Sequence, residues 1–212
     1  MQPNVIRVIS GADDNTVTFS PAQALGAQVT MAYAQWVGLE ATEDFLVAAT
    51  GRIQVAQFLV GQSAHSTQTD FWGDPAIGIL QPATQYQTYY AFLAPDTFLH
   101  SYVTVVASVG AGSEPIYLDD QPLGAVLFTG PIGTSGYGAA RVSLDGGEHV
   151  ITSAAPFGIT VYGFASYPSY LYPGRQGLDA LPPLAHGPLL HAEPPGAASA
   201  ADKVHQRNGI RL

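Results

Sequence analysis

The stretch Leu144–Phe164, LDGGEHVITSAAPFGITVYGF, decides the fold class. Apolar and polar residues alternate along it, as they do in a strand whose two faces meet different surroundings. β-Branched residues are frequent, and the paired glycines near its start are typical of a tight turn. The stretch therefore predicts two strands, at 149–152 and 158–165.

This stretch has a counterpart earlier in the chain, which indicates an internal repeat. Three pairs of segments align in the same order: Arg7–Ser10 with Thr104–Ala107, Leu39–Ala49 with Leu144–Ala154, and Ile53–Phe58 with Ile159–Phe164. Each pair has the same strand and turn pattern. We therefore expect an all-β fold of two tandem, related, jelly-roll-like β-sandwich repeats: 1–97 with a connecting segment, then 98–178, then a tail at 179–212.

The rest of the body also reads as short strands at about ten-residue spacing with turn signals between them, which is typical of β-sandwiches. The expected strands are 5–9, 16–19, 27–34, 35–39, 45–49, 53–60, 76–80, 86–93, 101–108, 116–118, 125–129 and 139–144. No segment before residue 178 sustains a helical period of apolar residues, so we expect no helix in the body.

The composition narrows the classes of partner. Charged residues make up only 11% of the chain and the net charge is −9, so a phosphate backbone would find few cations to pair with. Nucleic acid is therefore excluded as a partner, and apolar runs of only strand length exclude membrane insertion. Cysteine is absent, so there is no disulfide and no thiolate metal site.

The composition changes from about Leu181 onward. Paired prolines recur at Pro182-Pro183 and Pro194-Pro195, and proline cannot donate to a strand ladder. We expect an extended arm, with a short helix at 197–207. The arm is either a linker or a device for docking onto another copy.

With these features in view, the chain resembles the IgGFc-binding protein N-terminal domain family, including its bacterial surface members. The segments that carry the resemblance are Asn4–Ile9, Val55–Leu59, Gly73–Ala76, Ser135–Tyr137, Ala140–Val142, Ala155–Phe164 and Ser166–Gly174. The resemblance spans about residues 4–177. It implies an extracellular or cell-surface module of adhesive or matrix proteins, without catalytic activity.

The motifs of enzymes are not convincing in this chain. Gly61–His65 and Gly133–Gly136 each place a serine near glycine, but neither has the spacing and following helix of a nucleophile elbow. The six histidines show no H-x-H or H-E-x-x-H pattern that would support zinc. We expect the protein not to be an enzyme and to need no cofactor.

Calcium is the one metal that the sequence leaves open. Asp13 and Asp14 occupy a turn that corresponds to the turn at Asp119 and Asp120, and calcium prefers several hard oxygen ligands. The alternative, which we favour, is that these side chains shape turns by bonding to their own backbone.

Aromatic residues supply the candidate binding surface. Tyr167, Tyr170 and Tyr172 alternate with prolines after the last predicted strand, and Trp72 lies beside two aspartates in the connection between the repeats. Tyrosine combines a flat apolar face with a hydroxyl and is frequent at interfaces. The alternative is that these rings pack between the repeats.

Two functional hypotheses follow. The first is a non-catalytic adhesion or matrix module that binds a protein or a glycan. The second is a structural subunit of a filament, capsid or sheath, in which the arm or an open edge strand docks onto the next copy.

Overall fold

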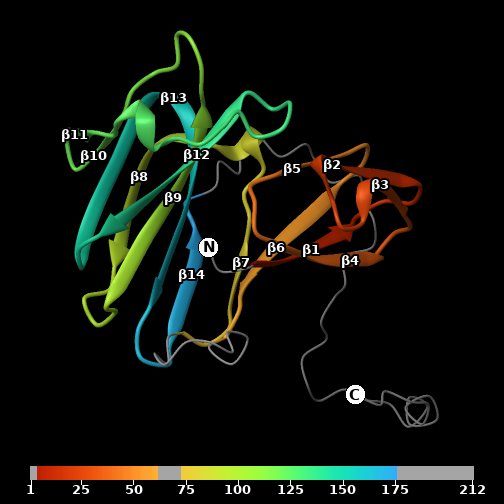
Figure 1. Ribbon diagram of the computed structural model, residues 1–212, viewed down its shortest axis with the longest axis horizontal. Coiled ribbons are helices and arrows are strands. Elements are labelled where there is room, and N and C mark those ends of the chain that lie inside the picture. The colour runs from red at the N-terminus through yellow and green to blue at the C-terminus, as the bar shows by residue number, and fades with distance from the viewer. Residues whose placement is uncertain (1–3, 62–72, 176–212) are drawn as a thin grey trace, which may run out of the picture. The chain divides into compact units, whose positions relative to one another are not determined.

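The computed structural model describes residues 4–61 and 73–175 and is all-β (Figure 1). Its strands form three antiparallel sheets, and no α-helix occurs in the described ranges. The strands are β1 Asn4–Ser10, β2 Asn15–Gln23, β3 Gly26–Met31, β4 Trp36–Ala41, β5 Leu46–Ala49, β6 Ile53–Leu59, β7 Ala76–Ile79, β8 Gln87–Ala94, β9 His100–Ser108, β10 Ile116–Leu118, β11 Gln121–Pro122, β12 Tyr137–Leu144, β13 Gly147–Phe164 and β14 Ser169–Pro173. Two short 3-10 turns, η2 Ala83–Gln85 and η3 Ala125–Leu127, interrupt them.

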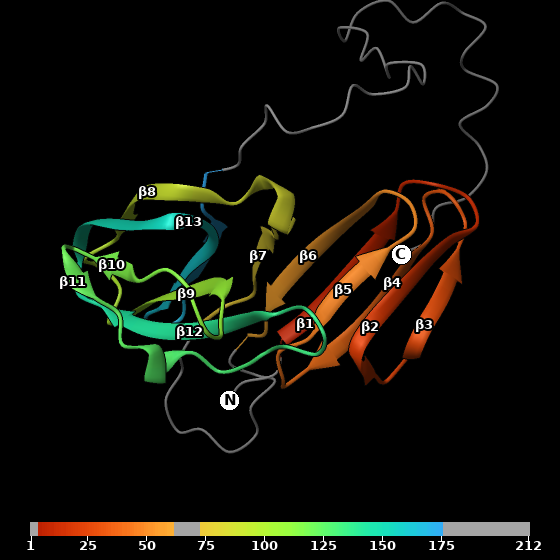
Figure 2. The same ribbon diagram turned by 90° about the horizontal axis from the view of Figure 1, so that it is seen from above.

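The first half of the body is two sheets packed face to face. One sheet has the order β4-β1-β6-β7 and the other has the order β3-β2-β5 (Figure 2). Alternate residues of these strands point into the space between the sheets, because successive side chains of a strand face opposite ways. The resulting core consists of Ile6, Val8, Val17, Phe19, Met31, Leu39 and Ala41.

The second half is a seven-stranded sheet that curls into a half-barrel around its own core. The 18-residue strand β13 makes the curl possible, because its two ends pair with different strands. Its first part pairs with β8 and β10, its second part pairs with β9 and β14, and the register with β8 shifts between Thr152 and Phe157. Pro156 lies inside this irregular stretch, where the regular pairing with β8 is interrupted. The N–H that proline lacks is therefore not needed for a hydrogen bond to β8.

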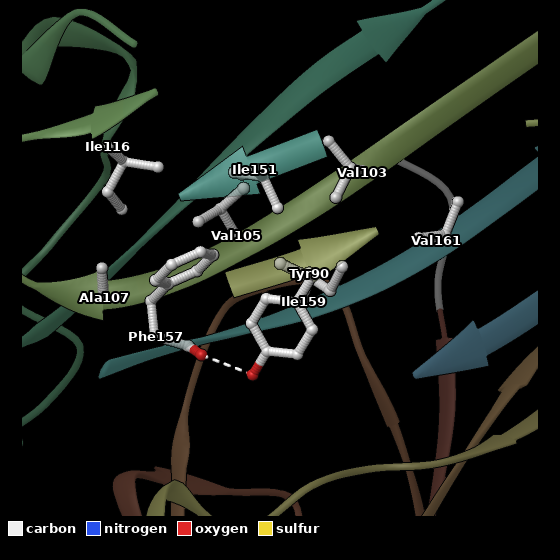
Figure 3. Packing of buried hydrophobic residues seen from close by; sticks show 9 residues of the cluster. All are labelled: Tyr90, Val103, Val105, Ala107, Ile116, Ile151, Phe157, Ile159 and Val161. Atoms are coloured by element: carbon white, nitrogen blue, oxygen red, sulfur yellow. Dashed lines mark hydrogen bonds between the residues drawn. The ribbon is translucent and has the colours of Figure 1, made fainter. Parts of the chain in front are cut away.

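The core residues of the second half pack around Phe157, the first residue after the irregular stretch (Figure 3). Its ring is fully buried and meets the Tyr90 ring edge to face at 5.1 Å between centroids. The Tyr90 hydroxyl donates a hydrogen bond to the Phe157 carbonyl oxygen at 2.6 Å and accepts one from the Gln87 N–H at 3.0 Å. Burial of a phenylalanine contributes about 1.5–3 kcal/mol, so this residue is a main anchor of the curl.

The two halves follow the same pairing order. In the first half β1 lies between β4 and β6, and β2 lies between β3 and β5. In the second half β9 lies between β12 and the end of β13, and β10 lies between β11 and the start of β13. The halves differ where a turn separates β5 from β6, since β13 runs through the corresponding position without interruption.

Contacts between the halves include an ion pair and two close approaches at glycine residues. Arg141 of β12 forms an ion pair with Asp44, which lies in the loop before β5. Gly133 lies so close to Ser20 that an added Cβ would approach the Ser20 backbone oxygen to 2.5 Å. A Cβ on Gly78 of β7 would come within 2.9 Å of the Leu171 side chain of β14.

Most predicted strands are confirmed, and the all-β class is confirmed with them. The strand predicted at 125–129 is wrong: η3 stands there, Val126 is 92% exposed, and only Thr129 bridges to another strand, at Ala139. The two strands predicted at 149–152 and 158–165 are one strand, β13. The sequence did not predict β11 or β14. The arm at 179–212, with its helix at 197–207, lies outside the described residues.

Candidate functional site

The three tyrosines predicted after the last strand lie in different surroundings, and Trp72 lies outside the described residues. Tyr170 and Tyr172 are on β14 and pack against the core of the second half. Tyr167 precedes β14, is 54% exposed and has a positive φ of 79°. Their role in binding remains a prediction, and only Tyr167 presents most of its surface to solvent.

Tyr170 and Tyr172 have intramolecular partners for both their rings and their hydroxyls. The Tyr170 ring meets Phe98 edge to face at 4.7 Å between centroids, and its hydroxyl donates to Ser101 Oγ at 2.9 Å. The Tyr172 hydroxyl donates to the Leu93 carbonyl oxygen. Burial raises the pKa of both hydroxyls. The two side chains therefore tie β14 to the curled sheet.

The four candidate calcium ligands lie in tight turns. Asp119 and Asp120 form the two-residue loop between β10 and β11, both with positive φ, as in a type I′ hairpin turn. In the other turn, Asp13 Oδ1 accepts a hydrogen bond from the Tyr33 N–H at 2.9 Å, and Asp14 has a φ of 50°. In the part of the chain that the structure describes, no group of three or more acidic or histidine side chains is placed to hold a metal. Calcium binding here remains a prediction, and the contacts fit turn chemistry.

Asp119 has a further partner that the sequence did not reveal. Its Oδ2 lies 2.7 Å from His149 Nδ1, and its Oδ1 accepts from the Val150 N–H at 2.8 Å. Burial disfavours the charged form of Asp119, but the hydrogen bonds from His149 and Val150 outweigh burial and lower the pKa of the carboxyl. Burial likewise opposes the charged His149, yet Asp119 and the Asp145 carbonyl raise the pKa of the imidazole. The pair fastens the hairpin β10–β11 to β13.

A group of exposed aromatic and apolar side chains lies on the outward side of β8, β10 and β13. Tyr90, Ile116 and Ile151 are buried on the inward side, so their chain neighbours point outward. We name this surface the tyrosine face; it consists of Tyr89, Leu93, Tyr117, Val150 and Thr152, of which the first four are 56%, 53%, 39% and 38% exposed.

The register of the strands sets two tyrosines in line. Tyr117 of β10 pairs with Thr152 of β13, and Thr152 pairs with Tyr89 of β8. The three residues therefore form one row that crosses three strands. On the far side of Tyr117 the row continues to Pro122 of β11, which is also exposed.

The charge of the tyrosine face is low and negative. Glu148 is exposed and pairs with Leu93, so it lies at one end of the surface. Neither lysine nor arginine occurs in the strand segments 87–94, 116–118, 121–122 and 147–152 that form it. The face therefore offers two aromatic rings, three hydroxyls and one carboxylate.

A second aromatic surface lies on the outward side of β1, β4 and β6. The Arg7 guanidinium lies over the Trp36 ring at 4.2 Å and near the Phe58 ring at 5.3 Å from their centroids. Arg7 is central to the group and Trp36 is 56% exposed. These cation–π contacts stabilise the first sheet, and the Arg7 Nε is buried without a hydrogen-bond partner among the described residues.

An open hollow of about 300 Å³ lies where the halves meet. Its wall includes Pro21, Asp44 and the loop Thr129–Gly133. Arg141 Nη1 donates to Asp44 Oδ2 at 3.1 Å, and Thr129 Oγ1 donates to the same oxygen at 3.3 Å. The carboxylate is therefore held by internal donors.

The serine motif that falls in the described residues is a turn, as expected. Ser135 Oγ donates to the Ile132 carbonyl oxygen at 2.7 Å and accepts from the Tyr137 N–H at 3.0 Å. The hydroxyl thereby closes the loop before β12. The other motif, Gly61–His65, lies mostly outside the described residues.

Sequence reasoning missed Tyr89 and Tyr117 as surface residues. The segment Gln87–Ala94, QTYYAFLA, predicts a strand, but the adjacent tyrosines give no sign of which one faces the core. Only the pairing of β8 with β13 decides that Tyr90 points inward and Tyr89 outward. The alternation of side chains along the strand can be read from the sequence. Which of the two alternating sets faces the core is decided by strand pairing in the sheet.

The fold and its surfaces define an all-β domain with open aromatic faces and, in the described residues, no α-helix long enough to cross a membrane. A family model described as IgGFc binding protein matches residues 1–163, and the chain belongs to this family. This match confirms the resemblance drawn from the sequence. The family is one of binding domains and is not a known catalytic family. No curated protein and no solved structure matches the chain significantly.

Proposed function

We propose that the chain is a non-catalytic extracellular adhesion or matrix module that binds a protein or a glycan partner. The observation that carries this proposal is the tyrosine face, an exposed aromatic surface on a hydrogen-bonded sheet. Membership of a binding-domain family supports the same conclusion. The sheet fixes the positions of the rings, so a ligand meets a surface that needs little reordering.

The body consists, in this proposal, of two related repeats that form a continuous scaffold. Strand pairing supports it: Arg7 lies between Gly38 and Ala56, and Tyr102 lies between Ser143 and Tyr162. Ala56 and Tyr162 correspond in the alignment of Ile53–Phe58 with Ile159–Phe164, and Gly38 and Ser143 each lie one residue before the aligned segments that begin at Leu39 and Leu144. The alignment of Arg7–Ser10 with Thr104–Ala107 must be shifted by two residues to agree with this strand pairing. A shift of two residues leaves each side chain on the same face of its strand.

The proposed location is extracellular or at the cell surface. The family is typically secreted, and the chain has no cysteine whose redox state would matter there. A body with few cations also avoids unspecific attachment to phosphate-bearing polymers.

Binding of immobilised full-length chain to a panel of ligands tests the proposal. The panel contains an immunoglobulin G Fc fragment, because the family description names it, together with mucin glycoproteins and a glycan array. We expect at least one ligand to bind and to lose affinity when Tyr89 and Tyr117 are both changed to alanine. A folded protein that binds none of these ligands contradicts the proposal.

The alternative function is a structural subunit that assembles through the C-terminal arm or an edge strand. In the described part of the chain, β3 and β4 each pair on one side only, so each leaves a free ladder edge. Light scattering of the intact chain beside a version ending at Gly177 separates the two functions. Assembly of the intact chain alone favours the structural subunit, and a monomeric, folded intact chain rules it out.

A further inference from the structure

We propose that the tyrosine face binds a neutral, extended β-1,4-linked glycan, with alternate sugar rings stacked on Tyr89 and Tyr117. This inference rests on the proposed binding function and names its ligand class. It is argued from the spacing of the rings, their chemistry, the charge of the surface and its size.

The spacing follows from the strand register. Tyr117, Thr152 and Tyr89 stand on one row across β10, β13 and β8. Neighbouring strands lie about 4.7–4.9 Å apart, so the two tyrosines are separated by about 9.5 Å. In an extended β-1,4-linked chain each ring is turned over relative to the one before it, and the same face returns at every second ring. The separation of the tyrosines is close to that two-ring repeat.

The chemistry of the row suits a sugar chain. An exposed tyrosine ring presents a flat apolar face to the axial C–H groups of a pyranose, and its hydroxyl bonds to sugar hydroxyls. Thr152 lies between the two rings and offers a hydroxyl to the intervening sugar. Pro122 extends the flat surface beyond Tyr117 and provides a place for a further ring.

The charge of the surface selects among glycans. The strands of the tyrosine face carry Glu148 and no lysine or arginine. Sulfated or uronic acid chains would meet a carboxylate without a compensating cation. A neutral chain meets no such penalty, and Glu148 can accept hydrogen bonds from its hydroxyls.

The size of the surface argues against a protein as the occupant. Four partly exposed large side chains, two of them tyrosines, present on the order of 400 Å² of apolar area, given 150–250 Å² for a whole aromatic residue. A stable protein interface needs about 800 Å² on each partner. Three or four sugar rings match the smaller area.

Titration calorimetry of the full chain with cellohexaose and with hexa-N-acetylchitohexaose tests the inference. We expect at least one hexasaccharide to bind, and the disaccharide of the same series to bind at least tenfold more weakly because it reaches one tyrosine only. An oligogalacturonate of equal length is expected not to bind. Failure of both neutral hexasaccharides to bind overturns the inference.

Substitutions of the two tyrosines test whether the hexasaccharide binds at the tyrosine face. Tyr89→Ala and Tyr117→Ala are each expected to weaken hexasaccharide binding at least fivefold, whereas Tyr89→Phe keeps the stacking ring and loses less. Tyr33→Ala is the matched control, because Tyr33 is 68% exposed and lies on the β3–β4 turn, away from this face. Chemical-shift changes on the wild-type chain give a second readout that does not depend on a variant's folding. Shifts or losses confined to other surfaces contradict the inference.

The same variants separate this inference from the proposed function. If a protein ligand of the panel binds and depends on Tyr89, while neutral oligosaccharides do not bind, the face is a protein-docking surface. The glycan inference is then wrong and the binding function stands. If no ligand of either kind binds, both are wrong.

Discussion

Adjacent tyrosines at 89 and 90 have opposite roles, and the difference arises from one step along a strand. Tyr90 is 2% exposed, and its hydroxyl bonds to both the Phe157 carbonyl and the Gln87 N–H. Tyr89 is 56% exposed and lies on the tyrosine face. One residue type thus serves the core at one position and the surface at the next.

Tyr90→Phe is expected to lower the free energy of unfolding by about 1–3 kcal/mol. The substitution keeps the ring and removes both hydrogen bonds, leaving a buried carbonyl and an N–H without a partner. Tyr89→Phe is the control and is expected to change stability by less than about 0.5 kcal/mol. Urea unfolding followed by fluorescence measures both. Equal effects of the two variants would contradict the inward placement of Tyr90.

The pair His149–Asp119 is expected to make stability depend on pH. The pKa of His149 is raised in the folded chain above its usual 6.5, so its stabilising contribution is complete below that value. The contribution is lost as pH rises through the folded pKa. The lowered pKa of Asp119 has the opposite sign: its contribution is present above 3.8 and is lost as pH falls through the folded pKa.

Unfolding of wild type and His149→Gln between about pH 5 and pH 9 measures this dependence. We expect the stability advantage of the wild type to be largest at the acidic end and to shrink toward the alkaline end. Asp119→Asn should abolish that trend, because the charged partner is gone. An advantage that grows with pH would contradict the assignment of the proton to the folded imidazole.

At the scale of the element, β13 explains both what the sequence predicts and where it fails. Its two apolar-alternating parts are visible in the sequence, and both form strand. Their fusion into one strand that changes partners depends on β8, β9, β10 and β14, which lie apart in the sequence. The wrong strand at 125–129 has the same cause, since an apolar segment without a neighbour strand to pair with forms η3 instead.

Gly158 of β13 is expected to tolerate no side chain. A Cβ there would lie 2.2 Å from Tyr86 Cε1, and burial raises the pKa of Tyr86, in keeping with a ring held inside the fold. Gly158→Ala should lower the free energy of unfolding by about 1–3 kcal/mol through this overlap. Gly124→Ala is the control, because its nearest contact is 3.6 Å away and its φ is −61°.

Thermal unfolding of both glycine variants makes the comparison. If Gly158→Ala melts at the wild-type temperature, Tyr86 is not fixed against β13 as the structure has it. If Gly124→Ala is the more damaging of the two, the close approach at Gly158 does not govern the stability of the sheet.

At the scale of the whole molecule, the ion pair between Asp44 and Arg141 joins residues that are 97 positions apart. The hydrogen bonds that Arg141 donates to Asp44 favour the charged guanidinium more than burial opposes it, so they raise the pKa of Arg141. The pair is bidentate and its side chains are 31% and 26% exposed, so it is stronger than an open surface pair. It is one of the polar contacts between the halves, beside the hydrogen bond that Thr129 Oγ1 donates to Asp44.

Asp44→Asn is expected to lower the free energy of unfolding by about 1 kcal/mol, because Arg141 loses its charged acceptor while still partly buried. Glu43→Gln is the matched control, since Glu43 is the exposed neighbour of Asp44. Urea unfolding measures both variants. Equal stability of the two would show that the ion pair adds nothing to the stability of the contact between the halves.

Sequence alone determined the class of fold, most strand positions, the lack of a convincing enzyme motif and the family, because strand alternation and turn residues are local properties of the chain. The tertiary structure decided which of two neighbouring tyrosines is exposed, how β13 bends through two sets of partners, and which residues meet in a row. Those properties depend on the register between strands that are distant in sequence, and a shift of one residue in that register would turn the tyrosine face inward.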